Sequence, residues 1–121
     1  MDGSNPKTLS DLVTPVYREL KDSGWQYFKV DALRHLKYEG YNSFADYFAR
    51  KQLDREAVYR QFASSITTTL GPKVFKLMCW GVRLELIGLF DGCSLGNDGF
   101  AYGGFSEYNS FNNIVWRNGH R

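Results

Sequence analysis

The two histidines and two cysteines are the residues of this 121-residue chain best suited to metal binding or nucleophilic chemistry. His35 lies inside a predicted helix and His120 is the penultimate residue, so neither belongs to an HxxxH or HxH ligand pair. Cys79 and Cys93 are fourteen positions apart, a spacing that matches neither a disulfide framework nor a zinc knuckle. We therefore predict reduced thiols, no metal site and no cofactor.

Cys93 is the strongest candidate nucleophile, because it lies between glycine and serine in a predicted turn where a thiol is accessible. A small hydrolase or thiol enzyme that uses Cys93 is therefore our third hypothesis. Against it, a small side chain in a turn is the simpler interpretation, and acidic residues such as Asp91 and Asp98 are common in glycine-rich turns. The sequence GCSLGNDG also lacks the lysine and hydroxyl residue of a phosphate-binding loop. We expect the protein not to be an enzyme.

The most unusual stretch is the aromatic segment, residues 98–113, which reads DGFAYGGFSEYNSFNN. Its five rings are Phe100, Tyr102, Phe105, Tyr108 and Phe111. Tyrosine, phenylalanine, serine, glycine and asparagine together form the composition that binding loops use. No lysine or arginine occurs between residues 84 and 116, so a phosphate backbone would find no cation there. The segment predicts a surface for a protein partner or for self-association, although the same rings would also suit a core.

Nucleic-acid binding is the second hypothesis, and it rests on a basic cluster within eleven residues. The cluster consists of Arg50, Lys51, Arg55 and Arg60. Asp54 and Glu56 interrupt it, a mixture that favours a solvated helix face. The chain carries 15 basic and 13 acidic residues, a formal net charge of +2, which produces no strong long-range attraction for phosphate.

Length and composition predict a single globular domain over residues 1–121, with residues 1–7 flexible and residues 91–113 forming a Gly- and aromatic-rich loop. Hydrophobic residues make up 43% and charged residues 23%, which is ordinary for a folded protein. Aromatic residues at 17% exceed the needs of a small core. The polar start of the chain carries no secretory signal, and no apolar run reaches membrane-spanning length. We expect a soluble intracellular protein without membrane contact, in the cytoplasm or the nucleus.

Helices are predicted for the first 70 residues, because apolar residues recur there at spacings of three and four. The first helix covers residues 9–22 or begins afresh at Thr14-Pro15, and it stops at Gly24. Residues 25–30, WQYFKV, are predicted as a short strand or an extended connector. Asp31 is the expected N-cap of a second helix that ends at Gly40.

Two more helices are expected before Gly71-Pro72. Ser43 and Asp46 approximate a capping box for a helix over residues 43–51. Asp54 caps the next helix, which is expected to fray at residues 67–69, where three threonines follow one another.

The last 45 residues predict a small antiparallel sheet, which makes the fold class α+β. Residues 82–86 alternate apolar and charged side chains, the pattern of a strand with one wet face, and we expect a strand over 82–90 paired with one over 112–117. Residues 73–80 suit a helix or a strand, and Pro72 and Gly81 favour the helix. This order of elements resembles a winged-helix layout.

The apolar faces of these elements predict the core. Its expected members are Leu12, Val16, Leu33, Leu36, Phe44, Phe48, Val58, Phe62, Ile66, Leu77, Leu84 and Leu86. The sequence favours a non-catalytic binding protein that acts through its aromatic surface. We expect it to be an adaptor, an inhibitor, an assembly subunit or a regulator, including a viral or phage regulator.

Overall fold

The computed structural model describes residues 4–79 and 83–94, and within them the chain mixes helices with a small sheet, as an α+β fold requires. The helical elements are α1 (Pro6–Thr8), η1 (Leu9–Val13), α2 (Thr14–Asp22), α3 (Leu33–His35), η2 (Leu36–Tyr41), α4 (Ala45–Arg50), α5 (Arg55–Leu70) and η3 (Leu84–Leu86). The strands are β1 (Tyr27–Val30), β2 (Phe75–Met78) and β3 (Gly92–Cys93). Elements η1 and η2 are π-helical, and η3 is a 3-10 turn.

The sheet of the described residues is parallel, with strand order β1-β2-β3, so the predicted antiparallel sheet is wrong. Tyr27 pairs with Phe75 and Val30 with Met78, while Met78 pairs with Cys93 on its other side. The helices from α3 to α5 connect β1 to β2, and residues 79–91 connect β2 to β3. Each connection is long enough to return the chain to the starting edge of the sheet, which parallel pairing needs. The wing of a winged helix is an antiparallel hairpin, so that resemblance fails as well.

Two segments in the second half adopt structures other than those predicted. Residues 75–78 form β2, where a helix was favoured over 73–80, because β1 offers them a pairing partner. Residues 84–86 form the turn η3, where a strand was expected. Alternation of apolar and charged residues was misleading there, since Glu85 turns inward to an ion pair and Leu84 outward. The expected strand over 112–117 lies outside the described residues.

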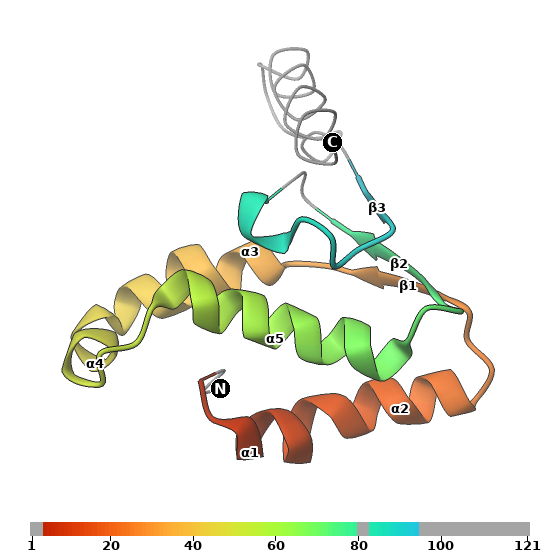
Figure 1. Cartoon of the computed structure of the whole chain (residues 1–121), viewed down its shortest axis with the longest axis horizontal. Helices are drawn as coiled ribbons and strands as arrows, with labels where there is room; N and C mark the ends of the chain where they lie inside the picture. Colours follow the sequence, from red (N-terminus) through yellow and green to blue (C-terminus); the bar gives the residue numbers. More distant parts are fainter. Residues whose placement is uncertain (1–3, 80–82, 95–121) are drawn as a thin grey trace, which may run out of the picture.

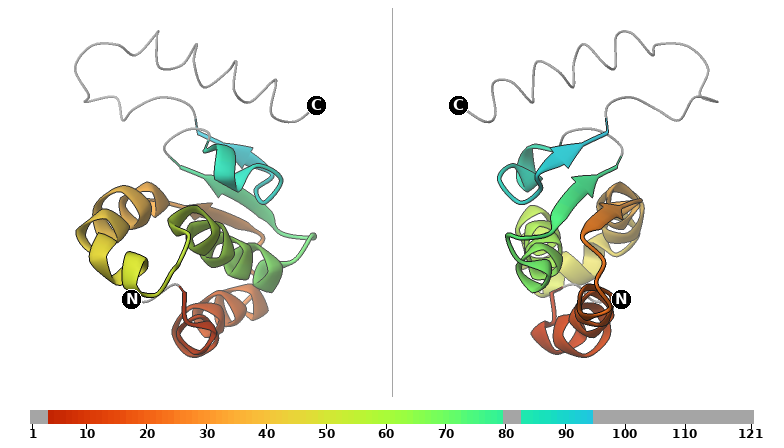
Figure 2. Two further views of the ribbon diagram at one scale, coloured as in Figure 1. Left: turned by 60° about the vertical axis from the view of Figure 1, so that its left-hand side comes forward. Right: turned by 90° about the vertical axis from the view of Figure 1, so that its right-hand side faces the viewer.

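The long helix α5 lies between α2 and the sheet (Figures 1 and 2). Its buried residues Tyr59, Ala63, Ile66 and Leu70 join one core cluster with Phe28 of β1 and others from the sheet and the first helices. Elements α3, η2 and α4 form a second helical arm beside the start of α5 (Figure 1). The sheet therefore has an inner face, turned to α5, and an outer face.

Several predicted helix boundaries are confirmed and others are wrong. The helical backbone runs without a break from Pro6 through η1 to Asp22, so the alternative of one helix over residues 9–22 is the correct one, and Gly24 follows its end with a φ of +95°. Asp54 caps α5 by accepting hydrogen bonds from the backbone N–H groups of Glu56 and Ala57.

The fraying at residues 67–69 does not occur, because α5 runs to Leu70 and Thr67 is buried. Ser43 does not cap α4, since its hydroxyl instead donates to the carbonyl of Glu39. Asp31 accepts from the N–H of Ala32, but Ala32 itself precedes α3 in a left-handed conformation.

The predicted core is correct in part. Leu33, Phe48, Val58, Ile66 and Leu86 are buried, whereas Leu36, Phe62 and Leu77 are half-buried. Four expected members are exposed instead: Leu12, Val16, Phe44 and Leu84.

In the first helix the buried positions are Leu9 and Val13, because that side of η1 faces the core. Leu9 and Val13 lie on one side of this helix and Leu12 and Val16 on another, and both pairs have helical spacing. Periodicity alone therefore does not show which side is buried.

Candidate functional site

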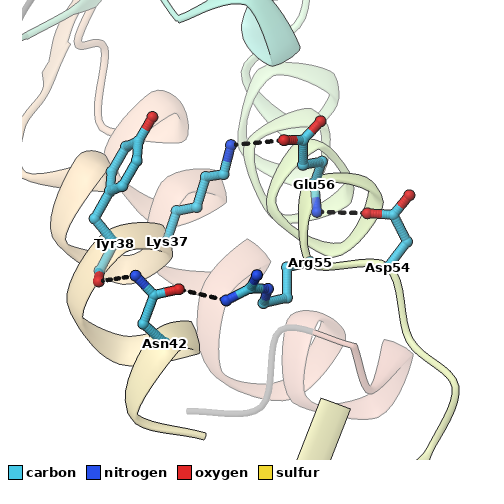
Figure 3. A pocket seen from close by; sticks show the side chains of 6 residues that line it. All are labelled: Lys37, Tyr38, Asn42, Asp54, Arg55 and Glu56. Atoms are coloured by element: carbon cyan, nitrogen blue, oxygen red, sulfur yellow. Dashed lines mark hydrogen bonds and ion pairs between the residues drawn. The ribbon is translucent and has the colours of Figure 1, made fainter. Parts of the chain in front are cut away.

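A polar pocket lies between η2 and the start of α5, with a volume of about 520 Å³ (Figure 3). Lys37 and Tyr38 come from η2, and Asn42 follows that element directly. Asp54, the N-cap of α5, stands opposite with its neighbours Arg55 and Glu56. The pocket exists because η2 packs beside the first turns of α5, which brings together residues up to 19 positions apart.

Lys37 forms the inner wall of the pocket. Its ammonium donates to Glu56 at 3.3 Å and to Glu85 of η3. Burial alone lowers the pKa of Lys37, but the hydrogen bond and charge of Glu85 outweigh that effect and raise it above its ordinary value. Burial is the largest single influence on the pKa of Glu85 and acts to raise it, but the hydrogen bond and charge of Lys37, a backbone hydrogen bond and the charge of Arg83 together outweigh burial, so this pKa is lowered. Both groups are therefore charged at neutral pH.

Arg55 and Tyr38 form the outer wall. The Arg55 guanidinium donates to the side-chain oxygen of Asn42, and the amide of Asn42 donates to the backbone carbonyl of Tyr38 at 2.6 Å (Figure 3). The Tyr38 ring is partly exposed and lies 5.3 Å from the Lys37 ammonium and 5.8 Å from the Arg83 guanidinium, distances typical of cation–π contacts.

Tyr59 lies fully buried behind this wall, with its ring centroid 5.9 Å from the Lys37 ammonium. Its hydroxyl has no hydrogen-bond partner among the described residues. Burial, reinforced by the charge of Glu85, raises the pKa of Tyr59 far above its ordinary range. The interior next to Lys37 is thus polar and incompletely hydrogen-bonded.

The outer sheet face, formed by Tyr27, Lys29, Phe75 and Leu77, is a second candidate surface. The rings of Tyr27 and Phe75 stack with centroids 5.5 Å apart and planes 9° from parallel. Phe75 and Leu77 extend over Gly92 of β3, where a Cβ would lie 3.3 Å from Leu77 and 3.4 Å from Phe75. A glycine at position 92 therefore lets both side chains lie flat across the sheet.

The carboxyl ends of the three strands bring Asp31, Cys79 and Ser94 together. The Ser94 hydroxyl donates to the Cys79 sulfur at 3.4 Å. Hydrogen bonds from the Ala32 N–H and then from the Cys79 thiol lower the pKa of the Asp31 carboxyl. This edge is where open α/β sheets commonly bind ligands. Here the three groups satisfy one another and link the strand ends.

The basic cluster does not form one surface. Arg60 donates to the backbone carbonyls of Glu85 at 2.6 Å and Ile87 at 3.1 Å, so it fastens η3 to α5. Arg55 lines the pocket, while Arg50 and Lys51 are exposed at the end of α4. The prediction of a shared phosphate-binding patch gains no support from this dispersal.

The remaining predicted site residues are placed as follows. Burial raises the pKa of the Cys93 thiol, which keeps it protonated and weakly nucleophilic at neutral pH. The ring of His35 hydrogen-bonds to Glu39 at 2.6 Å on the surface of the second helical arm. The five aromatic residues from Phe100 to Phe111 and His120 lie outside the described residues.

Within residues 4–79 and 83–94, no cluster of His, Cys, Asp or Glu side chains is arranged to hold a metal ion. In the same ranges every helix is too short or too polar to cross a bilayer.

Sequence reasoning missed Lys37, Tyr38 and Asn42 as pocket residues, because no motif marks them and only the fold brings them to Arg55. Comparison of the chain with protein-family models and with curated proteins finds no match.

Proposed function

We propose that this protein is a non-catalytic binding module that docks on a protein partner, or on a second copy of itself, through an aromatic-rich surface. The observation that carries this proposal is the stacked pair Tyr27–Phe75 on the outer sheet face, whose rings remain 54% and 44% exposed. Exposed rings held in one orientation give apolar contact area at low entropic cost, which is why aromatic residues dominate binding hot spots.

The topology of the sheet supports the same surface. Parallel sheets are normally covered on both faces, because their strands carry apolar residues on both sides. Helix α5 covers the inner face, and the outer face keeps Tyr27 and Phe75 exposed. A partner that covers these rings would complete the usual arrangement. The aromatic segment, which follows β3 in the sequence, would enlarge the surface if its rings also face outward.

A protein partner fits better than a single-stranded nucleic acid. Stacking platforms for bases combine rings with cations on one surface. The outer sheet face offers the ring pair a single lysine, Lys29, whereas the four residues of the basic cluster lie on or beside α4 and α5, on the other side of the sheet. The high pKa of Cys93 supports the non-catalytic part of the proposal.

The test uses the double variant Tyr27→Ala/Phe75→Ala and, as a control, Phe44→Ala, which removes an exposed ring at the start of α4, remote from the sheet (Figure 1). Size-exclusion chromatography with light scattering measures self-association, and affinity capture from lysate with and without nuclease treatment detects other partners. The double variant is expected to weaken the observed complex at least about tenfold, the effect of a hot spot, while the control leaves it unchanged.

A second variant, Lys29→Glu, changes the charge of the same face without removing a ring and should also weaken binding. Thermal melts verify that each variant is folded. Binding that survives the double variant and Lys29→Glu, yet is lost in Leu12→Ala/Val16→Ala, would place the interface on the exposed stripe of the first helix and refute the proposal. Nuclease-sensitive capture that depends on Arg50 and Lys51 would refute it in favour of nucleic acid.

A further inference from the structure

The pocket between η2 and α5 carries charges of both signs that cancel. Lys37 and Arg55 are positive, and Asp54 and Glu56 are negative. A ligand with a net negative charge would meet the two carboxylates, and a net cation would meet the two basic groups. The pocket's volume of about 520 Å³ suits a small molecule. Size and charge together favour a small ligand that carries one group of each sign.

Lys37 and Asp54 are already bound by other groups of the protein, whereas Arg55 and Glu56 form weaker interactions that a ligand can replace. Lys37 is held by Glu85, and the Asp54 carboxylate accepts the N–H groups that begin α5. Arg55 donates to the neutral amide of Asn42, and it forms no ion pair with a carboxylate among residues 4–79 and 83–94. Glu56 is 69% exposed, and its 3.3 Å contact with Lys37 is long for a hydrogen bond between charged groups. Arg55 and Glu56 are therefore available to a ligand.

We propose that this pocket binds a small zwitterion of the α-amino acid class, with its carboxylate on Arg55 and its ammonium on Glu56. The planar guanidinium of Arg55 matches a carboxylate through two parallel hydrogen bonds, a stronger interaction than the present one with an amide. The partly exposed Tyr38 ring forms the wall against which the ligand side chain packs. This site is separate from the outer sheet face, so it stands or falls independently of the proposed function.

A phosphate-bearing ligand suits the pocket less well. The N-terminus of a long helix such as α5 favours anions, but here Asp54 occupies that position as N-cap and Glu56 adds a second negative charge. Lys37 is already held by Glu85. A phosphate would therefore find Arg55 as its cation and Glu56 as a repelling carboxylate. A ligand that carries a carboxylate for Arg55 and an ammonium for Glu56 avoids that repulsion.

The experiment titrates the full chain with each standard L-amino acid in millimolar excess and follows backbone amide NMR shifts and the melting temperature. At least one amino acid should shift the amides of residues 54–57 and 37–38, while its N-acetyl and carboxamide derivatives, which each lack one charge, should bind about tenfold or more weakly. Arg55→Gln and Glu56→Gln should each cause a similar loss. Arg50→Gln, a matched change on α4, should bind normally.

Three results would overturn the proposal. The first is the absence of any shift at these amides with every amino acid. The second is that the singly charged derivatives bind as tightly as the parent amino acid, which would mean that the pocket does not recognise both charged groups of one ligand. The third is a shift caused by inorganic phosphate or adenosine monophosphate but by no amino acid, which would assign the pocket to phosphate.

Discussion

Lys37 and Glu85 lie 48 positions apart in the chain and form an ion pair in which each side chain is only 13% exposed. The pair links η2 to η3, and η3 belongs to the segment that carries the chain from β2 to β3. Arg60 of α5 holds the same turn through two backbone carbonyls. Two cations of the helical layer, Lys37 and Arg60, thus hold η3 in place. Because η3 lies in the connection between β2 and β3, these contacts help to position the third strand of the sheet.

Replacing Lys37 by Met should destabilise the fold by roughly 2 kcal/mol, because the largely buried Glu85 carboxylate would lose its partner. This value lies between the contribution of an exposed pair and the cost of breaking a fully buried one. Urea unfolding followed by circular dichroism measures it. The double variant Lys37→Met/Glu85→Leu should recover much of the loss, since no charge is left unpaired. A double variant as unstable as Lys37→Met would contradict the pairing.

Stability should fall at acid pH. The pKa values of Glu85 and Asp91 lie below their ordinary values of 4.5 and 3.8, because hydrogen bonds and the charges of Lys37 and Lys76 together outweigh the effect of burial. Their contribution is therefore complete above those ordinary values and is lost as the pH falls through the lowered ones. The raised pKa of Lys37 means that its contribution disappears only as the pH rises beyond its ordinary value of 10.5.

Urea unfolding at neutral pH and at successively lower pH values tests this dependence. Glu85→Gln should be less stable than the parent at neutral pH and should lose less stability on acidification. Parallel curves for the two proteins would show that Glu85 does not titrate as inferred.

Two leucines that differ in burial provide a matched test of the core. Leu70 of α5 is fully buried, whereas Leu84, which the sequence pattern assigned to the core, is 67% exposed. Leu70→Ala should cost about 2–5 kcal/mol through lost burial and a cavity. Leu84→Ala should change the free energy of unfolding by less than about 0.5 kcal/mol. Equal costs would mean that η3 is turned differently in solution.

Gly71, which ends α5, has a φ of +78° and a ψ of 179°, a region that residues with a side chain avoid. Gly71→Ala should therefore cost about 1–3 kcal/mol. Gly40→Ala is the control: Gly40 lies within η2 without a positive φ, and an added Cβ would meet its nearest atoms at 3.8 and 3.9 Å. That change should be neutral or slightly stabilising. Thermal melts of both variants distinguish the two positions.

Local sequence was sufficient wherever the deciding interaction is local. Asp54 caps α5 through N–H groups two and three residues away, and Gly24 follows the end of α2 with a positive φ that glycine adopts without strain. The strand expected within residues 25–30 is also present, as β1, because aromatic and β-branched residues favour extended backbone. These features depend on a few neighbouring residues, so a single sequence contains the information that determines them.

Tertiary structure decided the direction of the sheet, the inward side of the first helix and the pocket. Residues 75–78 form a strand because they pair with Tyr27–Val30, 48 positions away. The local sequence around residues 75–78 contains no information about that partner. Glu85 turns inward because Lys37 is there to receive it, which reverses the faces that alternation alone implied. Arg55 meets Asn42 and Tyr38 only because η2 packs beside α5. Long-range pairing and packing outweigh local patterns in each case, since burial and ion pairing contribute more free energy than the weak preferences of short segments.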